Sequence, residues 1–370
     1  MNANTSRQNA AAWEEGAQLF DRTTRDLPPG RHQFHKERMM AQIHETRQAE
    51  QTGNDRGARR TTPARTRRFG LPRPAITLPA LAATVAVAIG AVVVTSGGEA
   101  RQGGLATGPA LTTTVGVASS EGVPQLLDEI ALAAADGKHP VAGPGQYVYI
   151  ESKVAETFVR TVNDKSSLAS HALHTRQVWK SPDGTKGWLI DPAVNDSPEG
   201  ETLSLPDEQG NTPRADLNSP SYDYLAKLTT DPDKLLAKIY KETEGQGNTP
   251  DQQAFTTIGD LLRQSYPPGE LYSALFKTAA KIPGVVMVDD AVDAAGRHGV
   301  AVARLDETSG QREEWIFDKK THVFLGDRTV QVKGTSGEDG LIKPGTVVAT
   351  SAIVKRAIVD GIKETPSQAG

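Results

Sequence analysis

A run of 25 residues without a charged side chain, from Pro74 to Gly98, constrains this sequence more than any other feature. Its centre, Ala75–Thr95, reads AITLPALAATVAVAIGAVVVT. As an α-helix it would extend about 32 Å at roughly 1.5 Å per residue, matching a bilayer core of roughly 30 Å. A buried helix of a soluble core is the alternative, but such helices rarely run this long without a charge. The run therefore predicts one transmembrane helix over residues 74–97.

The charges on either side of this run are unequal. Residues 1–73 carry 14 Lys and Arg against 8 Asp and Glu, whereas the rest of the chain has a net charge of −10. Positive residues are retained on the cytoplasmic side of a membrane span, so this bias predicts a cytoplasmic N-terminus and an extracellular C-terminal domain at the cell membrane. The flanking arginines either set this topology or also contact anionic membrane lipid; those closest to the run are Arg65, Arg67, Arg68 and Arg73.

Composition divides the rest of the chain into segments. The short helices expected near the N-terminus contain too few apolar residues for a core of their own. Gly, Pro and Thr enrichment marks flexible stretches on both sides of the apolar run. The predicted order is a cytoplasmic helical segment (1–50), a basic flexible linker (51–73), the transmembrane helix (74–97), a flexible tether (98–120), an extracytoplasmic domain (121–363) and a disordered tail (364–370).

The C-terminal domain is predicted to be α+β. Apolar residues alternate from Gln146 onward, which is typical of strands, and Ser181–Gly184 has the residues of a hairpin turn. Helical periodicity follows between Asp231 and Lys281, and strands return from Val285. Because strands occur in consecutive runs rather than alternating with helices, we expect a curved antiparallel sheet packed with the central helices.

No catalytic chemistry is evident in the sequence. The absence of cysteine excludes a thiol nucleophile, and the GxSxG, HExxH, P-loop and GxGxxG patterns are missing, so we expect no enzyme, metal or cofactor. Glu313 and Glu314 are adjacent carboxylates, but neighbouring positions on a strand point to opposite faces, which argues against a shared site. The arginine-rich linker lacks interleaved aromatic residues apart from Phe69, so we expect no nucleic-acid partner.

A curved sheet with helices across its concave face leaves an apolar groove, a usual setting for a lipid-like ligand. Four aromatic residues on the first predicted strands are candidates for lining it: Tyr147, Tyr149, Trp179 and Trp188. Packing in the core or on the sheet surface is the alternative role for these side chains.

Several short motifs carry a resemblance to a known family. They are His35–Met40 before the apolar run, Trp179–Gly184, Pro267–Pro268 with Ile282–Val285, Asp293–Arg297, and Ile316–Asp318 with Leu325–Gly326 beyond it. With these motifs the chain resembles a family of uncharacterised actinobacterial single-pass membrane proteins associated with sigma factors. The family's outer domain is similar to the half-barrels of lipoprotein carriers and envelope-stress sensors.

The resemblance implies a regulatory function. It suggests an anchored sensor or regulator whose outer domain binds a hydrophobic ligand or envelope protein, while the cytoplasmic helices engage a sigma factor or another cytoplasmic protein. Zinc-containing anti-sigma factors use a His and two cysteines, so any sigma-factor contact here would be metal-free. The alternative is a lipid- or lipoprotein-binding carrier, or an envelope binding module, without signalling.

Overall fold

The computed structural model describes residues 105–137, 139–163, 165–195, 197–203, 214–337 and 340–366. The expected cytoplasmic segment (1–50), the basic linker (51–73) and the apolar run (74–97) lie outside the described residues, as does the end of the expected tail (364–370).

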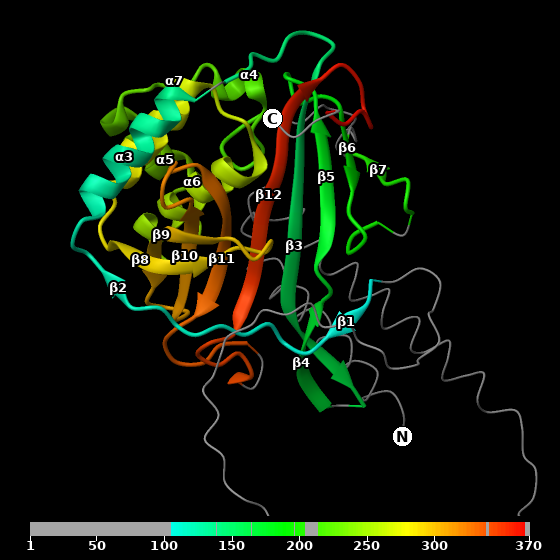
Figure 1. Ribbon diagram of the computed structural model, residues 1–370, viewed down its shortest axis with the longest axis vertical. Helices are drawn as coiled ribbons and strands as arrows, with labels where there is room; N and C mark the ends of the chain where they lie inside the picture. Colours follow the sequence, from blue (N-terminus) through cyan, green and yellow to red (C-terminus); the bar gives the residue numbers. More distant parts are fainter. Residues whose placement is uncertain are drawn as a thin grey trace, which may run out of the picture. The chain divides into compact units, whose positions relative to one another are not determined.

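Twelve antiparallel strands form one sheet in the order β2-β8-β9-β10-β11-β12-β3-β5-β6-β7, with β4 joined to β3 and β1 joined to β4 (Figure 1). The strands are β1 (Thr107–Gly108), β2 (Ala118–Ser119), β3 (Tyr147–Val162), β4 (Lys165–His171), β5 (His174–Lys180), β6 (Gly187–Ile190), β7 (Glu201–Thr202), β8 (Val285–Val292), β9 (His298–Asp306), β10 (Gln311–Phe317), β11 (Phe324–Gln331) and β12 (Val347–Val359).

Local turn chemistry sets the hairpins of this sheet. Between β5 and β6, the backbone N–H of Gly184 donates to the Ser181 carbonyl at 2.9 Å, and Gly184 has a φ of 78° that favours glycine. The Asp183 carboxylate accepts from the Ser181 hydroxyl at 2.6 Å. β3 then joins the two halves of the sheet, because its first residues pair with β5 on one side and with β12 on the other.

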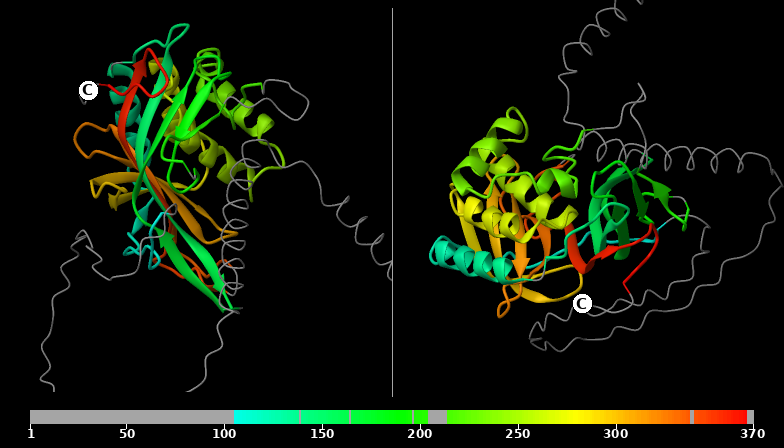
Figure 2. Two further views of the ribbon diagram at one scale, coloured as in Figure 1. Left: turned by 90° about the vertical axis from the view of Figure 1, so that its right-hand side faces the viewer. Right: turned by 90° about the horizontal axis from the view of Figure 1, so that it is seen from above.

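Five helices accompany the sheet in the described part of the chain: α3 (Val123–Asp136), α4 (Tyr222–Leu225), α5 (Pro232–Glu242), α6 (Pro250–Gln264) and α7 (Gly269–Ala279). Side chains cap several of them; Asp231 accepts from two N–H groups at the start of α5, and Thr249 accepts from the Gln252 N–H at the start of α6. Figures 1 and 2 show the long helices gathered over the β8–β11 part of the sheet. Phe255 of α6 stacks on Trp315 of β10 with ring centres 3.8 Å apart.

The structure corrects the predicted fold class. Among the described residues, the large antiparallel sheet dominates and helices account for 23% of the structure, so the expected α+β arrangement with a transmembrane helix is wrong. The physical reason is that nearly every segment with alternating apolar residues pairs with an antiparallel neighbour in one continuous sheet. The helices cover only one part of that sheet.

The structure also corrects the predicted membrane topology. No helix in the described part of the chain combines the length and apolar character needed to cross a bilayer. The longest, α6, has 15 residues and reaches about 22 Å at roughly 1.5 Å per residue, short of a core of roughly 30 Å. This finding overturns the prediction of a single-pass membrane protein with an extracellular domain; the segment expected to span (74–97) is not among the described residues.

Residues 105–119, which fall within the expected tether (98–120), contact the sheet in the structure. We call them the strap. Its strand β1 pairs with β4, Thr112 pairs with Thr346, and β2 pairs with β8. Alternation alone could not reveal these strands, because each of them has only two residues.

Candidate functional site

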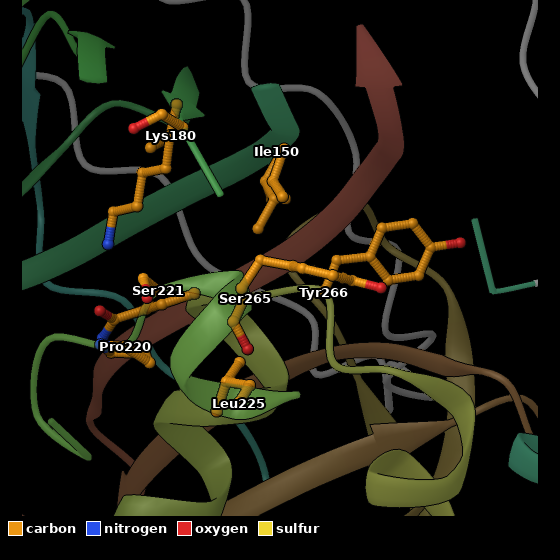
Figure 3. Close-up of a pocket in the computed structure, with 12 residues that line it drawn as sticks. Ile150, Lys180, Pro220, Ser221, Leu225, Ser265 and Tyr266 are labelled. Carbon is orange, nitrogen blue, oxygen red and sulfur yellow. The ribbon is translucent and has the colours of Figure 1, made fainter. Parts of the chain in front are cut away.

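A pocket lies where β3 and β5 meet α4 and the chain that follows α6 (Figure 3). The free space around it, about 340 Å³, includes open solvent, and the part that it encloses is about 20 Å³, room for about one water molecule. We call it the Lys180 pocket. It is lined by Val148, Ile150, Val178, Lys180, Ser181, Pro220, Ser221, Tyr222, Leu225, Gln264, Ser265 and Tyr266.

Strand alternation supplies the floor of this pocket. Val148 pairs with Lys180, and Ile150 pairs with Val178, so the four side chains point to the same face of the sheet. Val148 and Ile150 belong to the same apolar core as Leu225 and the helices. The floor is therefore apolar, except at Lys180.

The walls come from two chain segments outside the sheet. Ser221 caps α4 by accepting a hydrogen bond from the Tyr224 N–H at 3.1 Å, and the Asp223 N–H donates to the Pro182 carbonyl at 2.9 Å. These bonds hold the start of α4 against the β5–β6 turn. On the other side α6 ends at Gln264, and the extended backbone of Ser265 leads Tyr266 along the pocket.

Among the described residues that line the pocket, Lys180 is the only one with a charged side chain. Figure 3 shows its ammonium group extending toward Pro220 and Ser221. No hydrogen bond or ion pair to another described residue engages this ammonium group. Burial, and to a smaller extent the positive charge of Arg176, lower the pKa of Lys180. Placing a cation among apolar side chains without a partner costs free energy, so the binding of an anion beside the Lys180 ammonium would be favourable.

Farther along β5, the basic side chains on this face are already neutralised. His174 Nε2 and Arg176 Nη1 contact the two carboxylate oxygens of Asp191 at 3.0 and 2.6 Å. Burial alone would raise the pKa of Asp191, but its hydrogen bond with His174 and the charge of Arg176 outweigh it and lower the pKa to about 2. Asp191 therefore balances these two bases, and no carboxylate of the described residues pairs with Lys180.

The aromatic residues predicted to line a groove lie on the opposite face of the sheet from the Lys180 pocket. Tyr149 and Trp179 are buried with ring centres 5.0 Å apart, and the Trp179 indole N–H donates to the Glu364 carbonyl at 2.7 Å. Tyr147 and Trp188 pack against this pair. The structure thus brings the four side chains together as a packed cluster, and none of them lines the pocket.

Sequence reasoning missed the residues that do line the pocket. Lys180 and Ser181 follow Trp179 directly, and Ile150 follows Tyr149 on β3. Because successive residues of a strand point to opposite faces of the sheet, the alternation along β3 and β5 indicated which residues lie on the pocket face. Ser221, Leu225 and Tyr266 come from a capping turn and from chain beyond a helix, which no motif marks. The membrane-flanking arginines at 65, 67, 68 and 73 lie outside the described residues.

The described residues contain no group of three or more His, Asp or Glu side chains arranged to hold a metal ion. Comparison with known proteins finds no matching family model and no matching curated protein. The function therefore has to be argued from the chemistry of the pocket.

Proposed function

We propose that this protein binds a small amphipathic anion in the Lys180 pocket. The apolar part of the ligand packs against Ile150, Val178 and Leu225, and its anionic group pairs with the Lys180 ammonium. The observation that carries this proposal is a lysine at the edge of an apolar pocket: no described residue pairs with its ammonium group, and the other described residues that line the pocket are uncharged. An acyl chain ending in a carboxylate or a phosphate has this combination of properties.

The other polar groups of the pocket suit the same ligand. Ser221 uses its oxygen as an acceptor for the Tyr224 N–H, so its hydroxyl hydrogen can turn toward a ligand. A neutral ligand would leave the ammonium unpaired in the closed complex, and a cationic one would repel it. The pocket therefore favours an anion over a neutral or positive molecule of the same length.

Binding of decanoate to the full-length protein, measured by isothermal titration calorimetry, tests this proposal. A charge-assisted contact contributes about 1.5–3 kcal/mol, so we expect Lys180→Met to weaken decanoate binding roughly 10- to 100-fold. Lys320→Met removes an exposed lysine of the β10–β11 turn and should leave the affinity unchanged. Decanol and decylamine, with the same chain, should bind more weakly than decanoate.

Equal affinities for decanoate and decanol, or an unchanged affinity in Lys180→Met, would refute the proposal. A pH series provides a further check with a defined sign. Because the ligand pairs with the ammonium form, decanoate affinity should fall as the pH rises through the lowered pKa of Lys180. In Lys180→Met this fall should disappear.

Ligand binding is compatible with both the carrier and the sensor expected from the sequence. Contact of residues 1–50 with a sigma factor stays a prediction, since these residues lie outside the described part of the chain. Recovery of a sigma subunit by the full chain, but not by a chain lacking residues 1–50, would support the regulatory role. The absence of a sigma subunit among the proteins recovered with the full chain would favour a carrier.

A further inference from the structure

The hairpin of β3 and β4 extends beyond the rest of the sheet (Figure 1). β12 pairs with β3 as far as Glu156, and β5 pairs with it as far as Val154. The last residues of β3, up to Val162, therefore pair with β4 alone. This leaves an outer edge on β4 that the main sheet does not cover.

The strap covers only one end of this outer edge. In β1, Gly108 pairs with Ser170 of β4. The strap then leaves β4, because the Leu111 N–H donates at 3.1 Å to the hydroxyl oxygen of Thr157 on β3. β1 therefore has only two residues, and the part of β4 nearer to the hairpin tip has no neighbour from the strap.

Two residues of β4 have backbone groups on the uncovered part of the edge. The Ala172 N–H donates to the Ala106 carbonyl of the strap at 2.8 Å, so the backbone of Ala172 faces this edge. Because the backbone groups of alternate residues in a strand point to the same edge, those of Leu168 and Ser166 face it too. No strand of the described residues pairs with Leu168 and Ser166 there. Their N–H and C=O groups are available to an added strand.

A groove lies beside these two residues, between the strap, β4 and the loop that precedes β12. We call it the β4 groove. It offers about 600 Å³ of space and is open to solvent. Leu168 and Leu341 supply apolar surface, and Thr112 supplies a hydroxyl group. The Thr113 N–H donates to the Gly345 carbonyl at 2.8 Å, which holds the strap against the loop and fixes this side of the groove.

The charged side chains at the β4 groove are positive. Among the described residues that line it, Lys343 is the only charged one, and Lys165 precedes Ser166 near the hairpin tip. Both lysines are exposed, and neither pairs with a carboxylate of the described residues. Positive charge beside unpaired backbone groups is complementary to an acidic polypeptide segment.

We propose that the β4 groove binds an extended acidic segment of another protein, which adds a strand to the edge of β4 beside β1. The backbone of this segment pairs with Ser166 and Leu168, and its carboxylates lie near Lys343 and Lys165. Every second side chain of the added strand enters the groove. The groove lies at the opposite end of β3 from the Lys180 pocket, so this inference goes beyond the function proposed there and does not depend on it.

A second copy of this chain is less complementary to the same edge. Pairing of two β4 edges would bring two copies each of Lys165 and Lys343 to one interface. Exposed lysines on an edge strand oppose pairing of this kind. An acidic partner removes the repulsion, which favours it as the occupant.

Fluorescence anisotropy with a labelled peptide and the full-length protein tests the proposal. The probe is the peptide Ser-Glu-Val-Glu-Val-Glu-Ser with both ends blocked, and the control peptide has lysine in place of each glutamate. We expect the acidic peptide to bind and the basic peptide not to bind. An added strand uses one of its two edges, so N-methyl groups on the amides of one edge should abolish binding and those on the other edge should not.

Two variants test the contacts on the protein side. Lys343→Glu should weaken binding of the acidic peptide roughly three- to tenfold, because repulsion replaces an exposed attraction. Lys320→Glu changes an exposed lysine of the β10–β11 turn and should leave the affinity unchanged. Ser166→Pro removes an outward N–H group but no bond to β3, so it should weaken binding roughly tenfold. Its unfolding midpoint, compared with that of the unmodified protein, checks that the hairpin is retained.

Amide hydrogen exchange of the full-length protein identifies the edge directly. The N–H groups of Ser166 and Leu168 should exchange more slowly when the acidic peptide is bound. Those of Ser167 and Ala169 face β3 and should already be protected without the peptide. If β4 has only a structural role, the peptide will change none of these four rates.

The possible outcomes separate this inference from the function proposed for the Lys180 pocket. Equal binding of the acidic and basic peptides, no binding at about 1 mM acidic peptide, or slower exchange at a different strand would overturn the inference. A dimer of the free protein in which Ser166 and Leu168 become protected would make a second copy the occupant, and would overturn it as well. Decanoate binding should be unchanged in Lys343→Glu, so none of these results bears on the Lys180 pocket.

Discussion

Glu313 and Glu314 are neighbours in sequence but have different surroundings in the structure. Glu314 is fully buried on the face opposite α6, where its two oxygens contact Arg312 at 2.6 Å and Arg328 at 2.7 Å. The Arg312 guanidinium also donates to the Gly116 carbonyl of the strap at 3.0 Å. One carboxylate thus pairs with two arginines, while its neighbour lies among other carboxylates. The alternation of side chains along β10 produces this separation.

We expect Glu314→Gln to destabilise the protein by about 3–5 kcal/mol, because it leaves two buried guanidinium groups without their counterion. Urea unfolding followed by circular dichroism measures this loss. The surface change Glu307→Gln should stay within about 0.5 kcal/mol of the unmodified protein. Similar unfolding midpoints for the two variants would show that the Arg312–Glu314–Arg328 network adds little to stability.

α6 contacts Glu313 and also borders the Lys180 pocket. Its central residue Gly259 allows the close approach to Glu313 and Trp315, and its end leads into the wall of the Lys180 pocket. Glycine usually weakens a helix by about 1 kcal/mol relative to alanine. The glycine at position 259 is explained by the small distance between α6 and the side chains of Glu313 and Trp315, and not by helix propensity.

Gly259→Ala should therefore lower the unfolding free energy by about 1–3 kcal/mol, because the added methyl group overlaps Glu313 and Trp315 despite the better helix propensity. Lys277→Ala, an exposed position on α7, is the matched change to alanine and should have little effect. Denaturant unfolding of both variants provides the measurement. If Gly259→Ala were more stable than the unmodified protein, the Glu313 and Trp315 side chains would have to move aside to accommodate the methyl group.

At the scale of the whole described part of the chain, two ionisable groups, Asp191 and Glu313, give stability opposing dependences on pH. Asp191 has a pKa of about 2 in the folded protein, below its ordinary value, so its contribution is present above about pH 4 and is lost as the pH falls toward 2. Glu313 has a pKa of about 7, above its ordinary value, and folding favours its neutral form. Its contribution is complete below about pH 4.5 and is lost as the pH rises through 7.

The combined contribution of these two groups is expected to be largest between about pH 4 and 5. Unfolding free energies measured from pH 2 to pH 8 should show this maximum. Glu313→Gln should flatten the decline toward neutral pH, and Asp191→Asn should flatten the decline toward acid. Unchanged slopes in both variants would contradict the assignment.

The aromatic cluster and the Lys180 pocket show how far the sequence could predict the site. The sequence identified the strands that carry Tyr149 and Trp179, and alternation placed such residues on one face. It could not indicate that this face is covered by the chain around Glu364, while the other face receives α4 and the end of α6. That choice depends on contacts between segments far apart in the chain.

Local patterns determined individual elements of this protein: the helical periodicity between Asp231 and Lys281 corresponds to α5, α6 and α7, and the Ser181–Gly184 turn joins β5 to β6. Capping, turn and period-two signals act between neighbouring residues, so one sequence is enough to read them. The tertiary structure alone decided that the strands join in one twelve-stranded sheet, that Lys180 has no counterion among the described residues and that Glu313 lies against α6. Burial and charge pairing arise when distant segments meet, and no local pattern contains them.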